Sequence, residues 1–107
     1  MTWRDDMAEV LSTVDGVKGY AFRPKTPVAG DAWTLLSAYE LEDGWLMLKQ
    51  RILVFLPQDE KKASEWMDEH VGPLCVALRP MAYVERIDPT EGPATGQYSM
   101  TITLRSE

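Results

Sequence analysis

Apolar and polar positions recur with two different periods along the chain, and each period predicts one type of element. At the amino end, Trp3, Met7 and Leu11 recur at the spacing of one helix face. This pattern predicts an amphipathic helix over residues 2–14. Gly16 is expected to follow its end, because glycine readily adopts the left-handed conformation of a helix exit.

Five later segments have the alternation or the β-branched and aromatic content of strands. They are residues 17–22, 32–42, 45–56, 83–88 and 98–105. For residues 32–42, a helix is the competing interpretation. Asp43 and Gly44 separate two of these segments, and both residue types accept the positive φ angles of a type I′ turn. The two segments are therefore expected to form an antiparallel hairpin.

A second helix is predicted from its cap at Asp59 to about Leu78, with an apolar stripe facing inward. Pro73 lies inside this pattern. Because proline lacks a backbone donor and clashes with the preceding turn, a kink or a break is expected there. The segments 24–31 and 89–96 are rich in Pro and Gly and are expected to be exposed loops.

The predicted order is α-β-β-β-α-β-β. Such an order is typical of an α+β fold, with two helices packed on one face of a mainly antiparallel sheet of four to five strands. A chain of 107 residues has room for one core, so residues 1–107 are expected to form a single domain.

Charge and hydropathy exclude several classes of protein. The chain has 11 basic and 17 acidic residues, a net charge of −6, which disfavours binding to a phosphate backbone. No apolar run approaches the roughly 18 to 20 residues of a membrane span, and the amino end lacks the pattern of a secretion signal. We therefore expect a soluble protein that is not secreted.

The candidate chemistry is sparse. The chain has one histidine, His70, and one cysteine, Cys75, which lie about 140° apart around a helix. A packed histidine and a small buried thiol are the expected roles. Adjacent carboxylates such as Asp5-Asp6 point about 100° apart on a helix, so they do not converge on one substrate atom. No catalytic residue, metal site or cofactor is expected.

Several strings carry a resemblance to a known family. They are Gly30-Asp31-Ala32-Trp33, R-I-L-V-F-L-P-Q at residues 51–58, Ser64-Glu65-Trp66-Met67, and A-Y-V-E-R-I-D-P at residues 82–89. With the predicted order of elements, the chain resembles the tail terminator proteins of long-tailed bacteriophages with non-contractile tails, in the form found in phages of actinobacteria.

The resemblance implies a structural assembly protein without enzymatic activity. Members of that family form a hexameric ring that caps the tail tube, ends its polymerisation and forms the tail side of the head-tail joint. The implied partners are further copies of the chain, the tail tube protein and the head-side connector, or stopper, with DNA passing through the ring without specific binding. The implied location is the head-tail junction of the virion, after assembly in the host cytoplasm.

Two other functions stay open at this point. The chain could be another connector subunit such as a stopper, or a dimeric α+β domain that binds or converts a small molecule. Four Trp, four Tyr and six Met exceed the needs of a small core, and such residues are enriched at subunit interfaces.

Two sets of residues are expected to meet partners. The first set lies on one face of the third predicted strand, alternates apolar and basic side chains, and is the expected subunit interface: Trp45, Met47, Lys49 and Arg51. The second set lies in the two loops and is expected to face the tube, the connector or the lumen: Lys25, Thr26, Asp31, Glu91 and Thr95.

Overall fold

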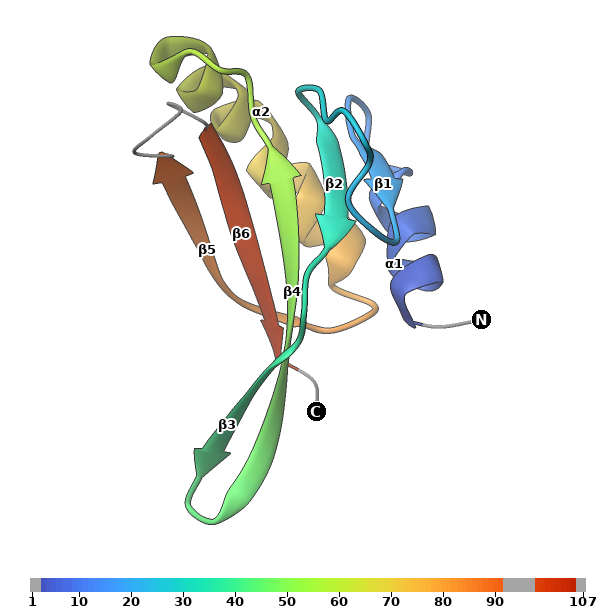
Figure 1. Cartoon of the computed structure of the whole chain (residues 1–107), viewed down its shortest axis with the longest axis vertical. Helices are drawn as coiled ribbons and strands as arrows, with labels where there is room; N and C mark the ends of the chain where they lie inside the picture. Colours follow the sequence, from blue (N-terminus) through green and yellow to red (C-terminus); the bar gives the residue numbers. More distant parts are fainter. Residues whose placement is uncertain (1–2, 92–97, 106–107) are drawn as a thin grey trace.

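A six-stranded sheet is the central feature of the computed structural model, which describes residues 3–91 and 98–105 (Figure 1). Its strands are β1 (Lys18–Tyr20), β2 (Asp31–Thr34), β3 (Ala38–Glu42), β4 (Trp45–Phe55), β5 (Tyr83–Glu91) and β6 (Tyr98–Arg105). They lie in the order β1-β2-β4-β6-β5, and β3 pairs with the first half of β4. Among these described strands, β1 and β2 alone pair in parallel, and the other pairs are antiparallel. The predicted α+β class with a mainly antiparallel sheet is confirmed.

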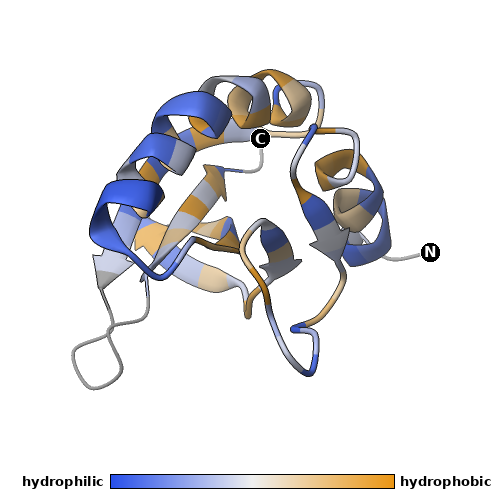
Figure 2. Cartoon of the chain, turned by 90° about the horizontal axis from the view of Figure 1, so that it is seen from above, coloured by the Kyte–Doolittle hydropathy of each residue, from blue (hydrophilic) through white to orange (hydrophobic). Residues whose placement is uncertain are grey.

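Two helices, α1 (Trp3–Leu11) and α2 (Glu60–Leu78), cover one face of this sheet. The core forms where they meet alternate residues of the two central strands. Its fully buried members include Met7, Leu11, Ile52, Val54, Leu74, Leu78, Met100, Ile102 and Leu104. Each such side chain contributes about 1.5 to 3 kcal/mol by leaving water. Figure 2 shows that the amino-terminal end of α2 is hydrophilic and that its carboxyl-terminal part is more hydrophobic.

Helix α2 begins as predicted but is not broken by its proline. The Asp59 carboxylate accepts a hydrogen bond from the backbone N–H of Lys62 at 3.1 Å, which confirms the predicted cap. The helix continues through Pro73 to Leu78, so of the two expected outcomes, a kink or a break, the break is wrong and the kink stays a prediction. Pro73 lies on the exposed side, while Leu74 and Leu78 are fully buried. Core packing therefore outweighs the loss of one helical hydrogen bond.

The predicted strand over residues 32–42 is two strands, β2 and β3. Two arginines stabilise the break between them. Arg51 donates from Nε and Nη2 to the carbonyl of Leu36 at 3.1 and 2.9 Å. Arg4 donates from Nη1 to Thr34 Oγ1 and to the carbonyl of Leu35 at 2.6 and 2.9 Å. These charge-assisted bonds satisfy carbonyls that would otherwise need a neighbouring strand.

The predicted loop over residues 89–96 begins too early. Strand β5 continues through Pro89, opposite Met100, and ends at Glu91. Because β5 is at the edge of the sheet, a residue without an N–H is tolerated there. The rest of that predicted loop, residues 92–96, lies outside the described residues.

The β3–β4 hairpin projects beyond the body of the domain. Its turn residues Asp43 and Gly44 have φ angles of 51° and 82°, which confirms the predicted turn with two positive φ angles. Lys49 is opposite Arg105, the last residue of β6, so no third strand among the described residues accompanies β4 beyond that pair. We call residues 39–48 the arm. It forms the lower end of the molecule in Figure 1.

The close approach of β1 to α1 gives a first prediction. A Cβ on Gly19 would lie 2.2 Å from the carbonyl oxygen of Ala8 and 2.8 Å from Leu11 Cβ. Gly19→Ala should therefore lower the free energy of unfolding by about 1 to 3 kcal/mol, measured by urea denaturation. Gly72→Ala is the matched control, because a Cβ there meets no atom within 4 Å. It should leave stability unchanged or raise it by up to about 1 kcal/mol, because Gly72 lies inside α2 and alanine is the better helix former. Equal losses in the two variants would contradict the account.

Candidate self-association surface

The two faces of the arm differ in chemistry. Residues paired across the two strands share a face, and the register pairs Tyr39 with Leu48 and Leu41 with Leu46. One face is thus entirely apolar. We call these four residues the apolar arm face.

The other face of the arm is mixed. There the register pairs Glu42 with Trp45 and Glu40 with Met47. Acidic side chains from β3 therefore lie beside large apolar side chains from β4. The arm carries negative charge on one side and none on the other.

The apolar arm face is exposed to an extent unusual for such residues. The exposed fractions are 63% for Tyr39, 79% for Leu41 and 65% for Leu46, and Leu48 is half-buried. On β4, this face continues the side on which Ile52 and Val54 form the core. The same strand therefore begins as uncovered apolar surface and ends as core. Contiguous exposed apolar patches of this kind are typical of interaction sites.

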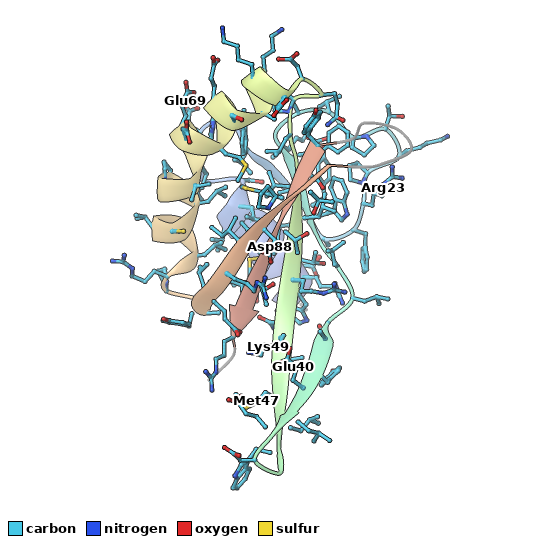
Figure 3. The ribbon with its side chains drawn as sticks, turned by 90° about the vertical axis from the view of Figure 1, so that its left-hand side faces the viewer. Arg23, Glu40, Met47, Lys49, Glu69 and Asp88 are labelled. Carbon is cyan, nitrogen blue, oxygen red and sulfur yellow. The ribbon has the colours of Figure 1, made fainter. Side chains whose placement is uncertain are left out.

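A buried lysine fixes the base of the arm. Lys49 is 4% exposed and forms a hydrogen-bonded ion pair with Glu85, with Glu40 at 4.0 Å from its Nζ. Figure 3 shows Lys49 and Glu40 beside each other where the arm leaves the body, with Met47 farther along the arm. The hydrogen bond from Lys49 lowers the pKa of the Glu85 carboxyl below its ordinary value. Because a buried ammonium is costly without a partner, this pair ties β4 to β5 at the point where the arm starts.

The four residues expected at the subunit interface have different environments. Trp45 is 74% exposed and Met47 is half-buried, both on the mixed face of the arm. Lys49 is buried and paired, and Arg51 binds the Leu36 carbonyl. This corrects the expectation of two free basic groups on that face, because both cations are used within the chain. A contact through Trp45 and Met47 stays a prediction.

The residues expected in partner-facing loops also differ. Lys25 and Thr26 are exposed. Asp31 is the first residue of β2, is 5% exposed, and accepts a hydrogen bond from the backbone N–H of Val28 at 3.0 Å. It therefore stabilises its own loop and cannot face a partner, which corrects that expectation. Glu91 ends β5, and Thr95 lies outside the described residues.

The histidine and the cysteine have ordinary environments. His70 donates from Nδ1 to the Trp66 carbonyl at 2.8 Å, and its ring stacks on Trp66 with centroids 4.0 Å apart. Cys75 is a free, half-buried thiol. Within residues 3–91 and 98–105, no three His, Cys, Asp or Glu side chains are placed to hold a metal ion. In the same part of the chain, no helix is long and apolar enough to cross a membrane.

An open groove lies between the end of α2 and the start of β5. It has a volume of about 640 Å³, and Cys75, Arg79, Met81, Tyr83 and Arg105 are among its lining residues. We call it the α2–β5 groove. Sequence reasoning missed it, because only the fold brings residues 75–84 beside Arg105. The apolar arm face was also missed, although Leu46 and Leu48 alternate with the residues that were chosen.

No family model matches the chain, and a search of curated proteins finds no match.

The ion pair at the arm base gives a second prediction. Glu85→Gln should destabilise the domain more than Glu40→Gln, because Glu85 forms the hydrogen-bonded pair with buried Lys49 and Glu40 is 4.0 Å away and 64% exposed. Thermal unfolding near neutral pH would measure the difference. Equal effects of the two substitutions would contradict the assigned role of Glu85.

The same pair predicts a pH dependence. Because the fold lowers the pKa of Glu85, the carboxylate stabilises the native state above the ordinary pKa of a glutamate, and this contribution disappears as the pH falls through the lowered value. The stability difference between wild type and Glu85→Gln should therefore shrink in acid. A difference that is constant from neutral pH into acid would contradict the prediction.

Proposed function

We propose that this protein is a structural subunit that associates with further copies of itself through the arm. In the specific form suggested by the sequence resemblance, it is a phage tail terminator. Its hexameric ring caps the tail tube, ends its polymerisation and forms the tail side of the head-tail joint. The proposal includes the absence of an enzymatic role.

The observation that carries the proposal is the exposure of the apolar arm face. Leu41 and Leu46 are paired at the outer end of the arm, 79% and 65% exposed. Burying an exposed leucine contributes about 1.5 to 3 kcal/mol, so an uncovered face of this kind favours association. The arm extends away from the body, so that its apolar face is accessible to a neighbouring subunit. An arm that meets a different surface on its neighbour makes a heterologous contact, and such contacts close into rings at a suitable rotation.

The charge of the chain is compatible with a ring around DNA. A net charge of −6 per subunit makes a ring strongly acidic, which disfavours retention of phosphates.

The environments of His70 and Cys75 also support a structural role. The His70 ring stacks on Trp66, and its Nδ1 donates a hydrogen bond to the Trp66 carbonyl. Among the described interactions, Cys75 is a free thiol without a neighbouring base that would activate it as a nucleophile.

The phage role is tested by inactivating the gene in the genome that encodes the protein. Electron microscopy of the lysate should show DNA-filled heads separate from tails, with tail tubes of abnormal length. Tails of normal length that fail to join heads would instead indicate another connector subunit. Complete virions in normal yield would contradict the proposal.

Self-association through the arm gives a further prediction. Leu41→Glu places a charge on the apolar arm face and should weaken association at least about tenfold, equivalent to about 1.4 kcal/mol. Leu36→Glu is a closely matched control, because Leu36 is 80% exposed, against 79% for Leu41, and precedes the arm. Sedimentation equilibrium measures both, with circular dichroism to confirm folding. Equal association of wild type and Leu41→Glu would exclude this face from the contact.

A further inference from the structure

The α2–β5 groove is the feature that the proposed function leaves unused. We infer that it receives the tip of the arm from a second copy of this chain, so that each subunit offers an arm on one side and a groove on the other. This inference rests on the self-association proposed above and names the surface to which the arm binds.

The groove is suited to an apolar occupant. Among its lining residues, Met81 and Tyr83 are large apolar side chains that are 37% and 64% exposed. The groove volume of about 640 Å³ lies within the range of roughly 300 to 1,000 Å³ that encloses small ligands. It can therefore accept several side chains from the tip of an arm.

Charge complementarity favours the arm as the occupant. Arg79 and Arg105 line the groove, and no ion pair is formed by Arg79 within the described residues. The arm ends in Glu42 and Asp43, both exposed. An arm that enters tip first therefore brings two carboxylates toward two guanidinium groups, while Leu41 and Leu46 meet Met81 and Tyr83. Paired opposite charges around an apolar centre are typical of a specific interface.

The contact is heterologous, because arm and groove are different surfaces. Figure 3 shows the arm hanging below the end of α2 with no helix beside it, so the arm is free of its own body along this length. A chain of arm-in-groove contacts closes into a ring at a fixed rotation, and at other rotations it gives an open filament.

Chemical cross-linking tests the pairing directly. Cys75 is the single cysteine and lines the groove, so Leu41→Cys adds one thiol at the arm tip. With a short bifunctional maleimide and the purified, concentrated chain, Leu41→Cys should give covalent dimers and longer chains at least about tenfold faster than Lys61→Cys, since docking raises the effective concentration of the two thiols. Lys61 is exposed near the start of α2, away from the groove.

Replacing Cys75 decides which surfaces were joined. Adding Cys75→Ala to Leu41→Cys should abolish the rapid cross-linking. Equally rapid cross-linking without Cys75 would mean that arm tips meet each other, and a rate no faster than that of Lys61→Cys would mean that the groove does not receive the arm. Either result would overturn the inference.

A charge exchange tests the complementarity. Arg79→Glu should weaken association more than Lys61→Glu, which changes the net charge equally, and Glu42→Arg combined with Arg79→Glu should restore association toward wild type. Failure of the exchange to restore association would contradict the pairing of arm tip and groove.

These outcomes separate the inference from the proposed function. If Leu41→Glu loses association but Leu41→Cys is not cross-linked to Cys75, the arm is part of the contact and it binds a surface other than the groove. If Leu41→Cys is cross-linked to Cys75 but gene inactivation leaves normal virions, the contact between arm and groove is supported and the phage role is refuted.

Discussion

The rest of the structure depends on a mismatch of length between the central strand and the elements that cover it. Strand β4 has 11 residues, which span roughly 36 Å at 3.3 Å per residue, and it pairs with β6 only from Lys49 onward. One half is buried under the helices, and the other half leaves the body with β3 as its single neighbour among the described strands. A two-stranded ribbon is marginally stable in water by itself. The arm therefore needs both a firm base and something to cover its apolar side.

The base is supplied by groups that look like surface charges in the sequence. Lys49 pairs with Glu85 across the sheet, and Arg51 holds the carbonyl of Leu36 beside the start of β3. These interactions fix where the body ends and where the arm begins. Residues 3–91 and 98–105 supply no such cover, and we propose that a second copy of the chain supplies it.

Much of the fold follows from the sequence, because local rules and the global fold agree in most segments. The alternation of Tyr98 to Arg105, the cap at Asp59 and the turn at Asp43-Gly44 are each specified within a few residues. The differences arise where long-range contacts override local chemistry. Pro73 is tolerated by a helix that buries Leu74, and Pro89 is tolerated because β5 turns out to be an edge strand.

The candidate surface was less predictable for the same reason. An alternating strand has two faces, and the sequence does not state which face a helix covers and for what length. The burial of Lys49 depends on Glu85, 36 residues away. The groove depends on Arg105 lying beside the end of α2. Such juxtapositions come from the register of β6 between β4 and β5, which local patterns do not encode.

Hydrogen–deuterium exchange as a function of protein concentration tests the central claim most directly, since it reports on the arm in the unmodified chain. Amides of residues 39–48 should exchange rapidly in dilute solution and become protected as the concentration rises, while those of Ile52 to Phe55 are protected throughout. Residues 79–83 should become protected in parallel with the arm. Exchange in the arm that is independent of concentration, in a sample shown to associate, would contradict the account.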